Sequence, residues 1–230
     1  MASTRFLSFN SNNPEKVNLE DLLPPQEEKF DISKPLPLRY TWKLWEQVEL
    51  GLKRGAAKHY SNNTKELATF STVQEFWEIW HQLPQPSALL MQKRMIRKDK
   101  NGMQQEVDGL MIFKDGVSPM WEDPANKCGG HLEFKFLAHM IGKGQIDEYW
   151  NNLVLALIGD TMEHGDLITG VRMVDKLNVV KNGFLRIEVW YTACYEAEKF
   201  SVFAKEVCKT MAVKVDGSAG ILPHYEEKKH

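Results

Sequence analysis

A tryptophan and an adjacent carboxylate lie in a loop-forming stretch near the middle of the 230-residue chain. Trp121 and Glu122 stand between a Lys-Asp-Gly turn sequence at 114–116 and the pair Gly129-Gly130. A large aromatic side chain in a loop is poorly placed for a core but well placed to stack on a planar ligand. The neighbouring carboxylate offers two acceptor oxygens, which match the N1–H and N2 amine donors of a guanine edge. The pair therefore favours a site for a guanine base.

A 7-methyl group on the base would strengthen such a site, because it makes the ring cationic. Stacking of a cationic ring on indole adds about 1–2 kcal/mol, and the contact of a carboxylate with the guanine edge adds about 1.5–3 kcal/mol. The alternative is that Trp121 packs the loop against the domain and that Glu122 is only solvated. The local composition leaves both interpretations open.

The composition is that of a soluble globular protein, with 43% hydrophobic and 26% charged residues. The net charge of −2 and the pI of about 6.4 provide no global positive field, so a nucleic-acid function must rest on a local site. Three cysteines without paired spacing argue against a disulfide framework and for a reducing compartment. No apolar run approaches the length of a membrane span. We therefore expect no membrane association and a cytoplasmic location, with the nucleus as a second one.

The hydrophobic pattern predicts an α+β protein with a single domain. In the first helix, at 71–82, Val73, Phe76, Trp77 and Trp80 recur at a helical period after a Ser or Thr N-cap. Two further amphipathic helices are predicted at 146–159 and 196–210. Strands are expected at 40–50, 88–96, 109–113, 132–136, 168–174 and 185–192. Hairpin-like spacing of these strands favours an antiparallel sheet covered on one face by helices.

The ends of the chain differ in composition from its centre. Residues 1–34 read as a flexible N-terminal arm, residues 35–215 as the folded domain, and residues 216–230 as a C-terminal tail.

Catalytic and metal-binding patterns are weak. The sequence Cys128-Gly-Gly-His131 places a thiol near an imidazole, but no third residue that would orient the pair is evident. No HExxH or CxxC spacing is present. We therefore expect neither an enzyme nor a protein with a metal or cofactor.

The stretch 113–130 resembles the cap-binding loop of the translation initiation factor 4E family, through Lys-Asp-Gly, Pro-Met-Trp-Glu-Asp, Asn-Lys and Gly-Gly. Further landmarks of that family follow in the same order along residues 36–211: Trp42-Lys-Leu-Trp45, Thr72-Val-Gln-Glu-Phe-Trp77, Trp150 through Leu157-Ile-Gly159, and Ile187-Glu-Val-Trp190. The resemblance implies a curved antiparallel sheet, with the cap on its concave face and three α-helices on its convex face.

The resemblance also assigns roles in the cap pocket. Trp121 would be one stacking wall, Glu122 the acceptor for the guanine edge, and Trp190 the contact of the 7-methyl group. The second stacking wall falls on Tyr60 by counting back from the Phe-x-Thr-Val stretch, and His59 is the alternative.

Cations for the cap triphosphate would come from the hairpin before Trp190. This hairpin is longer than in the family, so the alignment is open among four residues: Arg172, Lys176, Lys181 and Arg186. Counting back from Trp190 favours Arg186 and Lys181. If the additional residues of the hairpin fall after Lys176, Lys176 takes the place of Lys181. The family's arginine after Gly-Gly is His131 here, which has no fixed charge at pH 7.

The convex face would carry a site for a scaffold or repressor protein. The family's groove for a helical Tyr-x-x-x-x-Leu peptide corresponds to Pro37, Val73, Trp77 and Leu155. A leucine usual after the tryptophan of the second helix is Asn151 here, which weakens or re-specifies the groove. Trp77 as a plain core residue of an amphipathic helix is the alternative.

The resemblance implies a monomer that binds the 7-methylguanosine cap at the 5′ end of mRNA, in translation initiation or its regulation, with the cap as its ligand and no cofactor. The alternative is a paralogue with impaired cap binding that serves as an interaction adaptor or translational repressor. Tyr60, His131 and Asn151 favour that alternative, whereas the intact pair of Trp121 and Glu122 opposes it.

Overall fold

A computed structural model describes residues 34–48, 64–91, 93–98, 102–178, 183–194 and 196–230. The predicted N-terminal arm up to residue 33, the second stacking residue Tyr60 with its alternative His59, and the cation Lys181 lie outside the described residues. Their assignments remain predictions.

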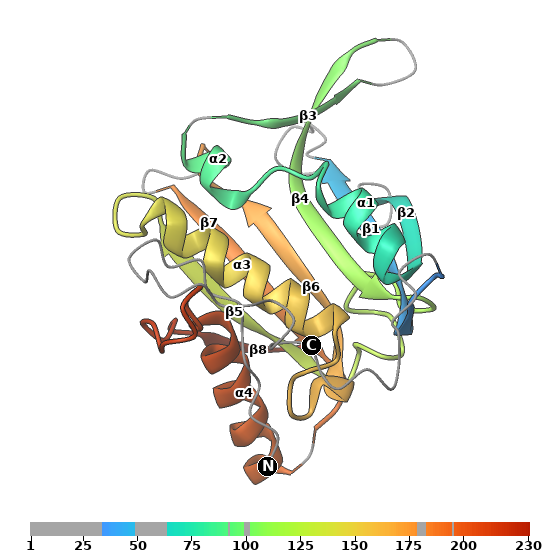
Figure 1. Cartoon of the computed structure of the whole chain (residues 1–230), viewed down its shortest axis with the longest axis vertical. Helices are drawn as coiled ribbons and strands as arrows, with labels where there is room; N and C mark the ends of the chain where they lie inside the picture. Colours follow the sequence, from blue (N-terminus) through green and yellow to red (C-terminus); the bar gives the residue numbers. More distant parts are fainter. Residues whose placement is uncertain (1–33, 49–63, 92, 99–101, 179–182, 195) are drawn as a thin grey trace, which may run out of the picture.

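Eight strands form one antiparallel sheet in the part of the chain that the structure describes (Figure 1). Its order is β2-β1-β4-β6-β7-β5-β8, and β3 pairs with β4 beside this path. The bounds are β1 Pro37–Val48, β2 Thr64–Thr72, β3 Met95–Lys98, β4 Gln104–Lys114, β5 Gly130–Leu137, β6 Ile168–Asp175, β7 Phe184–Tyr191 and β8 Glu226–Lys229.

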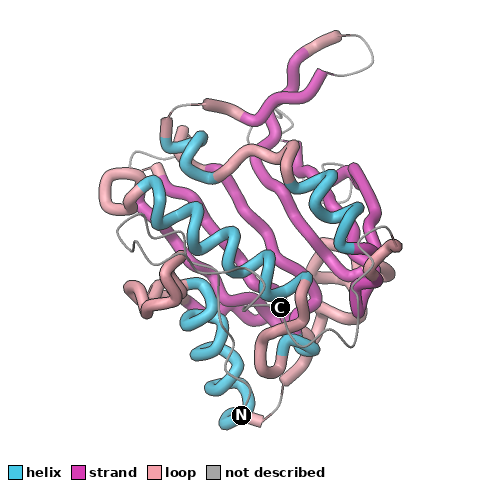
Figure 2. The backbone as a smooth tube through the Cα atoms, in the orientation of Figure 1, coloured by secondary structure: helices cyan, strands magenta, loops and turns pink. Residues whose placement is uncertain are grey.

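The helices of the described residues lie on one face of this sheet, as Figure 2 shows. The opposite face is called the open face below. The helices are α1 Val73–Trp80, the short α2 Pro86–Leu90, α3 Lys143–Ile158 and α4 Ala197–Met211, with a 3₁₀ turn at Gly165–Leu167. The predicted fold class, a curved antiparallel sheet with three main helices on its convex face, is confirmed. No helix within the described ranges is long and apolar enough to cross a membrane.

The first helix begins where its sequence predicts. Thr72 is the N-cap: its hydroxyl accepts from the Glu75 amide at 3.2 Å, while the Glu75 carboxylate accepts from the Thr72 amide at 3.1 Å. This reciprocal capping box satisfies two backbone donors that the helix leaves unpaired. Phe76 and Trp80 then turn inward and are buried in the core.

Alternation along β5 and β7 separates the core from the open face. Leu132 and Phe134 of β5 and Ile187 and Val189 of β7 are fully buried against the helices. The residues between them point to the opposite face, because successive side chains of a strand alternate. That face carries polar and charged side chains, and it is the face on which the site is built.

Several segments differ from the sequence-based expectation, among them β2, which no predicted strand covers. The strand predicted at 88–96 is wrong in its first half, where Pro86 starts the helix α2 and only Met95 and Ile96 enter β3. Proline is favoured at the first turn of a helix, and a short apolar run does not distinguish helix from strand. The segment 216–230, set apart as a tail, contains β8, which pairs with β5 at the sheet edge.

Candidate functional site

The loop between β4 and β5 holds Trp121 in an exposed position. Asn126, which is fully buried, donates from its side chain to the carbonyl oxygens of Ser118 and Met120 at 3.0 and 2.9 Å. The hydroxyl of Thr169 donates to Asn126 Oδ1 at 2.8 Å, so the loop is tied to β6. Trp121 itself is 51% exposed. Asn126 thus fixes the backbone of the loop, while the indole of Trp121 remains available to a ligand.

A cavity of about 600 Å³ lies beside this indole on the open face of the sheet. Its lining comes from the Trp121 loop and from β5, β6, β7 and β8: Pro119, Met120, Trp121, His131, Glu133, Arg172, Arg186, Glu188, Trp190, Lys228, Lys229 and His230. Glu122 is exposed next to Trp121 but is not part of this lining. The structure therefore brings Trp121 and Trp190 together with two of the predicted cations.

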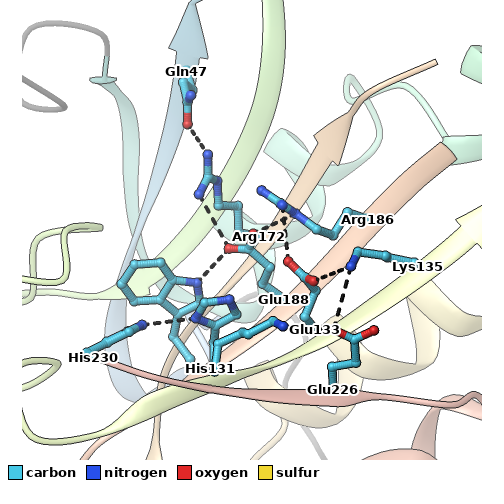
Figure 3. Close-up of polar contacts among 11 residues, drawn as sticks. Gln47, His131, Glu133, Lys135, Arg172, Arg186, Glu188, Glu226 and His230 are labelled. Atoms are coloured by element: carbon cyan, nitrogen blue, oxygen red, sulfur yellow. Dashed lines mark hydrogen bonds and ion pairs between the residues drawn. The ribbon is translucent and has the colours of Figure 1, made fainter. Parts of the chain in front are cut away.

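Strand register arranges these side chains in rows across the sheet. Trp190 is paired with His131, and His131 with Lys228 on β8. The next row begins with Arg172 on β6, which is paired with Glu188 on β7. Glu188 is paired with Glu133 on β5, and Glu133 with Glu226 on β8, so the rest of the row is acidic. The third row is basic and pairs Arg186 with Lys135. An aromatic and imidazole end is thus separated from the arginine end by carboxylates (Figure 3).

Trp190 is only 5% exposed, packed in an apolar cluster with Met111 and Phe113 and contacted by two imidazoles. The ring of His131 stacks on it at 5.5 Å between centroids and 15° between planes, and the ring of His230 lies 4.5 Å from it. The indole also contacts the ring of Phe113 edge to face. Its Nε1–H donates to Glu188 Oε2 at 2.8 Å. The orientation of Trp190 is therefore set from several sides.

The two histidines share a hydrogen bond. His230 Nδ1 lies 3.0 Å from the carbonyl oxygen of Asn126, and its Nε2 lies 2.9 Å from His131 Nδ1. In neutral rings, His230 then donates through Nδ1 and accepts at Nε2 the proton of His131 Nδ1. Burial lowers the pKa of both imidazoles below the ordinary value, which favours these neutral forms.

Glu188 is the centre of a buried charge network. Its carboxylate accepts from Arg172 Nη1 at 3.4 Å and lies 2.8 Å from Arg186 Nε as an ion pair without hydrogen-bond geometry. Burial alone would raise the pKa of this carboxyl, but Arg172, Arg186, His131 and the Trp190 N–H together outweigh that effect and lower it. Arg186 also pairs with Glu133 at 3.1 Å. The carboxylates therefore already neutralise much of the positive charge at this end of the cavity.

The comparisons with known proteins agree with this architecture. The family model described as "Eukaryotic initiation factor 4E" matches residues 37–229. The chain belongs to the eukaryotic initiation factor 4E family. Its relatives include the wheat "Eukaryotic translation initiation factor NCBP", 32% identical over 142 residues that are 62% of this chain and 52% of the relative. The rice "Eukaryotic translation initiation factor 4E-1" is 28% identical over 207 residues, 90% of this chain and 77% of the relative. The chain spans about half the length of the two cereal NCBP relatives that it matches.

Solved structures support the same fold. A schistosome eIF4E "complexed with m7GpppA and 4E-BP" has a TM-score of 0.57 at 21% identity, covering 78% of this chain and 84% of the other. The C. elegans eIF4E-3 in complex with "the 4E-binding protein Mextli and cap analog" has a TM-score of 0.56 at 22% identity, covering 79% and 88%. At these identities the likeness shows the fold alone.

The cations predicted from the initiation factor 4E resemblance fall in different places. Arg172 and Arg186 line the cavity, whereas Lys176 pairs with Asp108 at 3.2 Å and is not part of the lining. Lys228 and Lys229 line it too, and sequence reasoning missed them. Their local signal is only a charged Glu-Glu-Lys-Lys run, and pairing with β5 is what brings it to the cavity.

A cluster of potential metal ligands lies in the same cavity. One ligand atom from each of His131, Glu133 and Glu188 falls within 4.8 Å of the others. Both carboxylates are already in ion pairs with Arg186, and Glu188 also with Arg172. A divalent cation would have to approach these guanidiniums, so the arrangement does not favour one.

The helix-covered face carries a second cavity. Trp77 and Leu155, each 38% exposed, line this cavity of about 560 Å³ together with Asn151. Asn151 donates from Nδ2 to Gln85 Oε1 at 3.0 Å, which places an amide pair where the family usually has a leucine. Pro37 is exposed at the start of β1, and Val73 is partly buried at the start of α1. Neither residue belongs to this lining.

Proposed function

We propose that this protein binds the 7-methylguanosine cap of mRNA in the cavity on the open face, in translation initiation or its regulation. The observation that carries the proposal is the half-exposed Trp121 on a fixed loop at the edge of a cavity that also contains Trp190. An indole available at the rim can stack on a planar cationic base. In this proposal the protein acts by binding and not by catalysis, and its ligand is the cap.

Each base-contacting residue has one role in this proposal. Trp121 stacks on the base, Tyr60 forms the second wall, and Glu122 accepts from the guanine edge. Trp190 contacts the 7-methyl group. His230 occupies part of the indole surface of Trp190, so binding displaces the His230 ring from it.

The triphosphate is proposed to bind among Arg172, Lys176, Lys181 and Arg186. Arg172 and Arg186 are supported by their place in the cavity lining. Their guanidiniums are shared with buried carboxylates, so a phosphate must compete with Glu188 for them. This competition predicts a smaller contribution of phosphates to affinity than free arginines would make.

A scaffold or repressor protein is proposed to dock a helical peptide on the other face, at Pro37, Val73, Trp77 and Leu155. The exposed apolar surface of Trp77 and Leu155 beside a cavity supports this site. We further propose that the protein is a monomer and acts in the cytoplasm. A pure adaptor that does not bind the cap has weaker support, because Trp121 is exposed beside the cavity.

Tryptophan fluorescence tests the cap site. Wild-type protein is titrated with 7-methyl-GTP and with GTP, and the titrations are repeated with Trp121→Ala and Tyr60→Ala. The matched control is Trp77→Ala, which removes a comparably exposed indole from the opposite face. The proposal expects quenching by 7-methyl-GTP that Trp77→Ala retains and Trp121→Ala loses. No response of the wild type up to millimolar 7-methyl-GTP would contradict it and favour the adaptor.

A further inference from the structure

The indole N–H of Trp190 is bonded to an ionised carboxylate. Glu188 stands two residues before Trp190 on β7, so both side chains point to the same face of the sheet. The bond from Trp190 Nε1 to Glu188 Oε2 is 2.8 Å long, and Glu188 is 2% exposed. A buried hydrogen bond to a charged acceptor is stronger than one between neutral groups.

Glu188 stays negative at neutral pH despite its burial. Desolvation raises the pKa of its carboxyl, but Arg172, Arg186, His131 and the Trp190 N–H together lower it, and the net direction is downward. The two guanidiniums reach it from a neighbouring strand and from the next row of β7, as the labelled side chains in Figure 3 show. The group bonded to the indole N–H therefore carries a negative charge.

A negative charge at the N–H edge of an indole changes what its face attracts. The face of the ring already carries the negative part of the quadrupole, which draws cations. A carboxylate that accepts a hydrogen bond from the N–H polarises the ring further and makes its face more negative. The attraction grows for a cationic base and not for a neutral one.

We propose that Glu188 sets the preference of this pocket for a cationic 7-methylated guanine over a neutral guanine, as a positioning residue that acts through Trp190. The inference rests on the proposed function, because it takes Trp190 as the contact of the 7-methyl group. Glu188 holds the indole in orientation through Nε1 and supplies the negative field that a cationic ring requires.

The charge balance gives the substitution a definite direction. In Glu188→Gln the side chain can still accept from Trp190 Nε1, but Arg172 and Arg186 lose a neutralising partner. The excess positive charge then repels the methylated base and attracts phosphates. Because 7-methyl-GTP and GTP carry the same triphosphate, the ratio of their dissociation constants isolates the effect on the base.

The experiment measures this ratio by calorimetry in the wild type, in Glu188→Gln and in a matched control. Glu226→Gln is the control, because it removes a carboxylate from the same row without lining the cavity. We expect the preference for 7-methyl-GTP to fall roughly tenfold in Glu188→Gln and to stay at the wild-type value in Glu226→Gln. An unchanged preference in a folded Glu188→Gln variant overturns the inference.

Two further variants separate this role from a structural one. Arg172→Gln removes one of the two positive charges beside Glu188, so the preference for 7-methyl-GTP should rise. A mere loss of packing would instead lower this preference in both Arg172→Gln and Glu188→Gln. In a Trp190→Phe background, which lacks the N–H donor, Glu188→Gln should change the preference by less than about twofold. An equal loss in that background overturns the route through Trp190. A wild type with no preference for 7-methyl-GTP overturns the proposed function instead.

Discussion

The imidazole of His230 lies on the indole of Trp190, with 4.5 Å between the ring centroids. The same imidazole contacts the carbonyl oxygen of Asn126, the buried residue that fixes the Trp121 loop. The His230 side chain, at the end of strand β8, therefore contacts both the loop that carries Trp121 and the indole of Trp190. In the proposed function, cap binding rearranges these contacts.

Replacement of His230 by alanine should strengthen binding of 7-methyl-GTP. The ligand would no longer displace an imidazole held by two hydrogen bonds, each worth about 1 kcal/mol. We expect an affinity gain of roughly threefold to tenfold in a fluorescence titration. His224→Ala is the control, since this exposed histidine lies outside the cavity lining. Weaker binding by His230→Ala would show instead that His230 belongs to the ligand-binding surface.

Stability should fall as the pH drops below neutrality. Burial lowers the pKa of His131 and His230, whereas an unfolded imidazole titrates near its ordinary value of about 6.5. The unfolded chain then binds more protons than the folded one below neutral pH, so the free energy of unfolding decreases there. Carboxylates whose pKa is lowered, such as Glu188, lose their contribution only in a more acidic range.

Urea denaturation at pH values of about 7.5 and 5.5 measures this effect on either side of the ordinary imidazole pKa. The double variant His131→Asn/His230→Asn should show a smaller difference between the two conditions. The same pH dependence in the wild type and in the double variant would assign the loss of stability to other groups.

Much of the fold could be predicted because its signals are local. A Thr N-cap and a periodic apolar face predict the helix α1, and alternating side chains predict β5. The helix α2 was missed, because the apolar run after Pro86 has no period long enough to distinguish it from a strand.

The candidate site divides in the same way. Trp121 and Trp190 carry a recognisable local motif, and both reach the cavity. His230 and Lys228 reach it only through the pairing of β8 with β5, almost a hundred residues apart, and no local pattern specifies that register. The sequence does not single out Glu188, because its ion pair with Arg172 depends on the pairing of β7 with β6.

The capping box of α1 should contribute measurably to stability. Thr72→Ala removes the acceptor of the Glu75 amide, and loss of such an N-cap costs about 1 kcal/mol. Chemical denaturation measures the change, and Ser201→Ala, at an exposed position inside α4, is the control. A stability of Thr72→Ala equal to that of the wild type would mean that the helix start is held by packing alone.

The two faces of the sheet should be separable by substitution. Trp77→Ala should weaken binding of a helical Tyr-x-x-x-x-Leu peptide roughly tenfold or more, because it removes the large exposed aromatic of the groove. Leu67→Ala, an exposed apolar residue on β2 outside the groove, should bind the peptide as the wild type does. Peptide binding that survives Trp77→Ala would place the partner elsewhere.

Calorimetric titration of the wild-type protein with 7-methyl-GTP and with GTP tests the central claim most directly. The two ligands differ only in the methyl group and in the positive charge that it gives the base. A cap-binding pocket with two indoles should bind 7-methyl-GTP at least about tenfold more tightly than GTP. Equal affinities for the two nucleotides, or no binding of either, would contradict the account.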